Sequence, residues 1–176
     1  MKGKLIFKES HSFVGTWIWY MTVLFVLWMC GLFGWGMYQQ LILGETWGDK
    51  PMDDTMLLIV GISSIMITVA IMAFISLNRL TLEIDEKSIY VKFSPYFNQF
   101  KIFQKNDLQE VYVRKYKPIL EYGGWGLRVG LKKSKAYNIS GNWGLQLVFA
   151  DGKKLLIGTR KPKELEKAIE KFKAHG

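Results

Sequence analysis

Two long apolar runs without a charged side chain dominate the first half of this chain. One covers residues 12–44 and the other residues 55–78, and an acidic segment at residues 45–54 separates them. A helix needs about 20 apolar residues to cross a hydrocarbon core of about 30 Å. Both runs therefore predict membrane-spanning helices, at residues 13–38 and 56–77.

These two helices and the loop between them form the first predicted domain, residues 1–78. Lys2, Lys4 and Lys8 precede the first helix and Arg79 follows the second, whereas the loop is acidic. Positive charge beside a span favours the cytoplasmic side. We therefore expect a multi-pass protein of the plasma membrane, with both termini in the cytoplasm. A cleaved signal peptide would have a much shorter apolar core, so we interpret the first run as a retained span.

Three glycines toward the end of the first run, Gly31, Gly34 and Gly36, could let another helix approach closely. They are candidate helix-packing positions, for a protein partner or for a second copy of the chain. Alternatively, they reflect only the high frequency of glycine in membrane helices. Neither run holds Asp, Glu, Lys or Arg, which ion and proton pathways usually need, so a transporter acting alone is disfavoured.

The second predicted domain, residues 79–176, is basic, with 20 Lys and Arg against 10 Asp and Glu in a chain of net charge +9. Apolar and polar residues alternate in short segments, which is the pattern of half-buried strands. Seven strands are predicted, near residues 80–84, 89–93, 100–102, 108–113, 127–129, 145–149 and 155–157. From Pro162 the period becomes that of an amphipathic helix, with the apolar stripe Leu165, Ala168, Ile169 and Phe172.

Four segments and the start of the last helix form a set that can be compared with known families. They are residues 124–128 (GWGLR), 136–141 (AYNISG), 144–147 (GLQL) and 151–158 (DGKKLLIG), followed by Pro162, Glu164 and Leu165. In this order, after two apolar helices, they resemble the small bacterial membrane proteins that carry a PH-like domain, over residues 79–174. The resemblance implies a PH-like antiparallel β-barrel of two near-orthogonal sheets, closed by a C-terminal α-helix. It implies no catalytic residue.

Basic residues fall in clusters along the second domain. The clusters are Arg114, Lys115 and Lys117; Lys132, Lys133 and Lys135; and Arg160, Lys161 and Lys163, while Arg128 stands alone between apolar neighbours. A lysine near an anionic leaflet contributes about 1 kcal/mol to binding, so the first two clusters and Arg128 are the candidate surface for anionic lipid or a protein partner. The alternative is a solvated surface that only improves solubility. Nucleic acid is not expected, because the clusters lack a recognised binding motif.

The segment between the fifth and sixth predicted strands is rich in glycine and aromatic residues. One hypothesis makes Trp125, Arg128, Tyr137 and Asn138 a ligand-facing surface. The other, which we favour, makes the glycines tight bends of a small barrel and places Trp125 and Trp143 in its core.

Motifs for catalysis, cofactors or metals are not recognisable. Cys30 is the one cysteine, and His11 and His175 lie near opposite ends of the chain, so a zinc site is not expected. No catalytic residue and no cofactor are predicted. The sequence thus favours a non-enzymatic, membrane-anchored PH-like module that binds protein partners or anionic lipid at the cytoplasmic face. The alternative is a structural or assembly subunit of a larger membrane complex.

Overall fold

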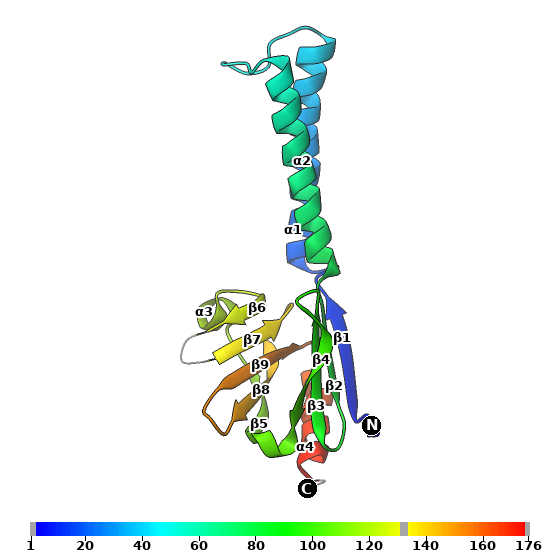
Figure 1. The fold of residues 1–176 in the computed structure, drawn as a ribbon, viewed down its shortest axis with the longest axis vertical. Coiled ribbons are helices and arrows are strands. Elements are labelled where there is room, and N and C mark those ends of the chain that lie inside the picture. Colours follow the sequence, from blue (N-terminus) through cyan, green and yellow to red (C-terminus); the bar gives the residue numbers. More distant parts are fainter. Residues whose placement is uncertain (1–2, 131–133, 175–176) are drawn as a thin grey trace. The chain divides into compact units, whose positions relative to one another are not determined.

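The computed structural model describes residues 3–130 and 134–174, which form two compact units (Figure 1). The helical unit is Val14–Leu77. The sheet unit combines the N-terminal segment up to Phe13 with the chain from Asn78 onward. The second helix ends at Leu77, one residue before the predicted boundary at residue 78. The segment before the first helix, however, belongs to the sheet unit, because it forms a strand there.

The helical unit consists of α1 (Trp17–Met37), the π-helical turn η1 (Tyr38–Ile42) and α2 (Asp54–Leu77). By length and composition, α1 with η1 and α2 are each apolar enough to cross a membrane. Thr16 caps α1 by accepting a hydrogen bond from the Trp19 amide, and Asp53 accepts one from the Met56 amide at the start of α2. Large apolar side chains remain exposed along both helices, which suits lipid surroundings better than water.

α1 and α2 pack closely at Gly61, a glycine that the sequence analysis does not single out. Gly61 lies against Phe33 and Met37 of α1, and a Cβ at this position would collide with the Met37 side chain. Elsewhere along the pair, the Trp19 indole donates a hydrogen bond to Ser76 Oγ at 3.0 Å. A small residue at position 61 is therefore what allows the close approach of the two helices.

The first sheet has four antiparallel strands in the order β1-β2-β3-β4. They are β1 (Phe7–Ser12), β2 (Arg79–Ile84), β3 (Ser88–Ser94) and β4 (Phe97–Gln104). The sequence does not predict β1, because two of its inward positions are the polar residues Glu9 and His11, which hide the apolar alternation. In the sheet, Glu9 lies opposite Leu82 and His11 opposite Leu80 of β2.

The second sheet has five strands in the order β5-β8-β9-β7-β6. They are β5 (Leu108–Lys115), β6 (Gly126–Val129), β7 (Ser134–Asn138), β8 (Trp143–Phe149) and β9 (Lys154–Thr159). β7 and β9 are parallel, and the other neighbours are antiparallel. A short helix, α3 (Pro118–Tyr122), covers one face, where Tyr116, Tyr122, Ala136 and Leu156 form a buried cluster.

The architecture differs from the expected barrel in three respects. Within the described residues there are nine strands rather than seven, the β7–β9 pair breaks the antiparallel order, and the strands form two separate sheets rather than a closed barrel. The sequence does not predict β7, because it is short and mixes Lys135 with Tyr137 on one face and Ala136 with Asn138 on the other. The turn η2 (Lys105–Asp107) carries the chain from the first sheet to the second.

The predicted apolar stripe of the last helix, α4 (Pro162–Ala174), is confirmed. Leu165, Ala168, Ile169 and Phe172 are buried, and Lys167 on the other face is exposed. α4 packs against β5, β1 and β8. Lys105 secures its C-terminal end, because the Lys105 amine donates hydrogen bonds to the carbonyls of Phe172 and Lys173, both at 2.9 Å.

Candidate functional site

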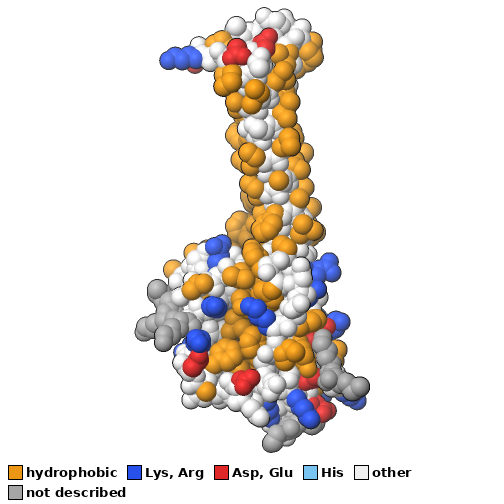
Figure 2. Space-filling view, viewed as in Figure 1, with side chains coloured by type: hydrophobic (Ala, Val, Ile, Leu, Met, Phe, Trp, Pro, Cys, Tyr) orange, Lys and Arg blue, Asp and Glu red, His pale blue; other side chains and the backbone are white. Residues whose placement is uncertain are grey.

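Lysines from both sheets surround a small cavity where β4 meets β7, which we call the seam pocket. Its volume is about 190 Å³, and it is lined by Lys101, Phe103, Lys135, Tyr137, Phe149, Lys153, Lys154 and Leu155. Figure 2 shows Lys and Arg side chains around a patch of hydrophobic side chains on one face of the sheet unit. The pocket thus combines an aromatic lining with a basic rim.

Strand register explains how these lysines come together. Lys101 lies opposite Val91, a fully buried residue of β3, so its side chain starts on the face that points toward the second sheet. Lys135 lies beside Leu155 in the parallel β7–β9 pair, and Leu155 is also buried. Both lysines are therefore at the border of the core, where the aliphatic stem covers apolar surface while the amine stays in water.

Aromatic rings fix the position of the Lys101 amine. Its Nζ lies 4.2 Å from the centroid of the Phe97 ring and donates a hydrogen bond to the Tyr137 hydroxyl at 3.2 Å. The Phe103 and Phe149 rings, with centroids 5.5 Å apart, contact each other across the two sheets. The pocket therefore has a rigid aromatic wall with one positioned amine.

Most of the positive charge of the seam pocket has no nearby carboxylate. Lys153 pairs with Asp151 at 2.6 Å, and the hydrogen bond from Lys153 holds the pKa of the Asp151 carboxyl below its usual value. Lys101 and Lys135 form no salt bridge with a carboxylate in the part of the chain that the structure describes. Lys154 lies beside Ser134 of β7, so its side chain starts on the other face of the sheet, where it also lines a cavity with Glu121. An anion entering the seam pocket would therefore not compete with a protein carboxylate for the Lys101 and Lys135 amines.

The first predicted basic cluster is different, because Arg114 is already paired. Its Nη2 lies 2.7 Å from Glu121 Oε2, and its Nε donates to Gln146 Oε1 at 3.0 Å. The hydrogen bond from Arg114 holds the pKa of Glu121 below its usual value. Lys115 and Lys117 are exposed. The cluster therefore does not converge on one site, and Arg114 stabilises α3 instead.

The other two clusters are also divided. Lys132 and Lys133 lie outside the described residues, whereas Lys135 is exposed at the seam pocket. Arg160 donates from Nε to the Ser140 hydroxyl at 2.8 Å, and Lys161 pairs with Glu164 at 3.1 Å; Lys163 is exposed. Among the described residues of these clusters, only Lys135 lines the seam pocket.

The glycine-rich aromatic segment does not form one surface. Trp125 is half-buried and Trp143, at the start of β8, is 38% exposed, so the prediction that both fill the core is wrong. Arg128 is exposed and donates to the Trp125 carbonyl at 2.8 Å. Asn138 is fully buried and hydrogen-bonds within the sheet unit, and Tyr137 alone lines the seam pocket.

The three candidate glycines of α1 have different surroundings. A Cβ at Gly36 would lie 2.6 Å from the Trp47 ring, so this glycine packs against the loop that follows η1. Gly31 and Gly34 are exposed, and nothing in the described residues lies within 4 Å of a Cβ at either position. Only Gly31 and Gly34 therefore remain open to another helix.

A buried polar network that the sequence analysis missed ties β1 to the end of β9. Glu9 accepts hydrogen bonds from the Thr159 hydroxyl at 2.5 Å and from the Arg160 amide at 2.8 Å. His11 Nδ1 is 3.5 Å from Glu9, but burial and the nearby Arg160 charge lower the pKa of His11 to about 4, so His11 is neutral at pH 7. The network is structural rather than open to a ligand, since Glu9 is buried and its oxygens are bonded.

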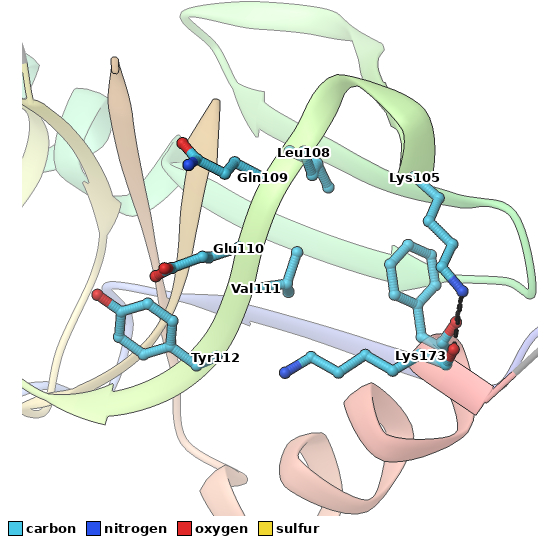
Figure 3. Close-up of a pocket in the computed structure, with 8 residues that line it drawn as sticks. Lys105, Leu108, Gln109, Glu110, Val111, Tyr112 and Lys173 are labelled. Carbon is cyan, nitrogen blue, oxygen red and sulfur yellow. Dashed lines mark hydrogen bonds between the residues drawn. The ribbon is translucent and has the colours of Figure 1, made fainter. Parts of the chain in front are cut away.

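A wider cavity of about 410 Å³ lies between β5 and the end of α4. Figure 3 shows Leu108 and Val111 on the side of β5 that faces Lys105, and the Lys105 amine turned toward the α4 carbonyls. Glu110 also lines this cavity. Because its one positioned amine is engaged and a carboxylate is present, this cavity suits an anion less well than the seam pocket.

A comparison with protein-family models, curated proteins and solved structures finds no match to this chain. In the described residues, no group of three His, Cys, Asp or Glu side chains could hold a metal ion. The chemistry of the seam pocket is therefore inferred from its own residues. Of the lysines that line this pocket, sequence reasoning missed Lys101, Lys153 and Lys154. For Lys101 the available signal was its position on the inward face of a strand.

Proposed function

We propose that this chain is a non-enzymatic, membrane-anchored module of the PH-like type at the cytoplasmic face of a bacterial plasma (inner) membrane. In this proposal α1 and α2 are the anchor, and the seam pocket binds the anionic headgroup of a lipid. The observation that carries the proposal is the convergence of Lys101 and Lys135, from different sheets, on one cavity, without a salt bridge to a carboxylate among the described residues.

The anchor is supported by the two apolar helices and by charge. The connecting loop is acidic, while Lys8 precedes the first helix and Arg79 follows the second, which favours cytoplasmic placement of the sheet unit. The connections are short, with residues 13–16 before α1 and Asn78 after α2. Since a residue spans at most about 3.6 Å, the sheet unit would remain within reach of the leaflet.

The pocket is suited to a phosphate group for two physical reasons. Lysine amines form charge-assisted hydrogen bonds with phosphate oxygens. Aromatic rings beside the amines exclude water, which strengthens the attraction between opposite charges. A lysine close to anionic lipid contributes about 1 kcal/mol, so the loss of two lysines should weaken binding roughly thirtyfold.

The full chain in neutral nanodiscs provides the test. Calorimetric titration with soluble dihexanoyl phosphatidic acid should show binding, and titration with dihexanoyl phosphatidylcholine should show much less. The double variant Lys101→Ala/Lys135→Ala should lose about thirtyfold in affinity. The matched control Lys163→Ala/Lys167→Ala removes the same charge from exposed positions around α4 and should bind like the wild type. Equal affinities of the two double variants would contradict the proposal.

A second candidate function, as a structural or assembly subunit, is favoured by the open surface at Gly31 and Gly34. Purification in mild detergent separates it from the first. A stoichiometric membrane partner that is lost in the Gly31→Leu/Gly34→Leu variant would support a subunit role. A lone particle that is unchanged by these substitutions would argue against that role.

A further inference from the structure

β6 extends one wall of the seam pocket. In the antiparallel β6–β7 pair, Leu127 lies opposite Tyr137 and Val129 opposite Lys135. Directly opposed residues of neighbouring strands point to the same face of a sheet. Because Lys135 and Tyr137 line the seam pocket, the side chains of Leu127 and Val129 continue its wall along the sheet.

This continuation is apolar and uncovered. Val129 is 71% exposed and Leu127 is 37% exposed. The first sheet ends at β4, whose Phe97 and Lys101 contact Tyr137 of β7, and β6 is the next and last strand of the second sheet. A short apolar strip, formed by Leu127 and Val129, thus continues the pocket wall that carries Lys135 and contacts Lys101. We call it the β6 strip.

We propose that the seam pocket and the β6 strip together bind a phospholipid of the anchoring membrane, with its phosphate among the lysines and one hydrocarbon chain along the strip. This inference rests on the proposed function, because it assigns a ligand class to the same pocket. A phospholipid supplies negative charge and hydrocarbon side by side, as the surface requires. A free phosphate or an acidic protein segment supplies only the charge.

Hydrocarbon contact makes a measurable contribution that is independent of the phosphate. Each methylene group taken out of water tightens binding by about fourfold when it is fully covered. The strip has only two large side chains, so partial cover of one short chain is expected. We therefore expect a soluble phospholipid with two six-carbon chains to bind at least about tenfold more tightly than the phosphate headgroup alone.

The experiment compares two probes on the full chain in neutral nanodiscs, with empty nanodiscs subtracted. Glycerol 3-phosphate reports the headgroup alone, and dihexanoyl phosphatidic acid adds the chains. The variant Leu127→Ser/Val129→Ser should bind glycerol 3-phosphate with the affinity of the wild type. Its affinity for dihexanoyl phosphatidic acid should fall, so that most of the difference in affinity between the two probes is lost. The control Ile119→Ser/Leu120→Ser removes two aliphatic side chains that are 66% and 75% exposed on α3, on the other face of the sheet, and should keep the difference.

The outcomes separate the two proposals. If the Leu127→Ser/Val129→Ser variant keeps the full difference in affinity between the two probes, the proposed hydrocarbon contact is overturned. This holds even if the lysine variant binds both probes more weakly than the wild type. If the Lys101→Ala/Lys135→Ala variant binds both probes like the wild type, the proposed function itself is overturned. The single variant Val129→Ser, at the more exposed position, provides the same test if the double variant unfolds; a retained difference would again contradict the inference.

Discussion

The helical unit and the sheet unit place their apolar side chains in opposite ways. On α1 and α2, large residues such as Phe25 and Met66 are exposed, and the buried positions include the small residue Gly61. In the sheet unit, large residues such as Phe93 and Phe172 are fully buried. The comparison shows that the surface of one unit is apolar enough to suit lipid surroundings, whereas an internal core stabilises the other.

The two units also differ in their buried polar groups. In the sheet unit, Asp85 accepts hydrogen bonds from Tyr90 Oη at 2.9 Å and from the Ser88 amide at 2.7 Å. Burial would raise the pKa of Asp85, but the hydrogen bonds together lower it below the usual value. The two apolar helices instead contain no charged residue between Trp17 and Met37 or after Asp54. Titration should therefore affect the sheet unit and leave the helices largely unchanged.

The largest expected difference concerns one phenylalanine from each unit. Phe172→Ala removes a ring that is 1% exposed and should lower the free energy of unfolding by about 3–5 kcal/mol. Phe25→Ala removes a ring that is 50% exposed on α1 and should change it by about 0.5 kcal/mol or less. Urea unfolding of the full chain in neutral detergent, followed by circular dichroism, measures both. Similar losses at the two positions would show that the units are not built differently.

The second prediction concerns acid. The pKa of His11 falls from 6.5 to about 4 on folding, because burial and Arg160 disfavour its charged form. The stability associated with neutral, buried His11 is therefore fully present above pH 6.5. As the pH falls from 6.5 toward 4, the free energy of unfolding should decrease by about 3 kcal/mol in total. His11→Leu should flatten the dependence of unfolding free energy on pH in this window. An unchanged pH profile in the variant would place the acid sensitivity elsewhere.

The third prediction compares glycines within the helical unit. Gly61→Leu places a side chain against Phe33 and Met37, and this overpacking should destabilise the helix pair by about 1–3 kcal/mol. Gly34→Leu meets open space and should leave the isolated chain unchanged. Thermal unfolding in detergent distinguishes them. A loss at Gly34 as large as that at Gly61 would indicate a contact between copies of the chain.

Much of this architecture could be predicted from sequence. Uninterrupted apolar runs predicted α1 and α2, because every position of a span has to be apolar. A period of 3.6 residues predicted the buried stripe of α4, because one face of that helix has to be apolar. β1 and β7 could not be predicted in this way. Glu9 is buried only because Thr159 and Arg160, far along the chain, supply its hydrogen bonds. The parallel pairing of β7 with β9 likewise depends on contacts that local periodicity does not report.

The candidate site was less predictable than the fold. Runs of basic residues indicated Arg114 and Lys135 equally, although Arg114 is paired with Glu121 and Lys135 is not paired within the described residues. Lys101 belonged to no cluster in the sequence, yet register brings it to the same cavity as Lys135. Pairing and register, rather than the local density of positive charge, therefore distinguish a binding surface from a solvated one.

The smallest predicted effect tests this central claim most directly. Lys135 at the seam pocket and Lys115 at the end of β5 are both exposed lysines, so Lys135→Ala and Lys115→Ala remove the same charge. Calorimetric titration of the full chain with dihexanoyl phosphatidic acid should show about fivefold weaker binding for Lys135→Ala and unchanged binding for Lys115→Ala. Equal losses in the two variants would contradict the account, because they would show that net charge alone attracts the lipid.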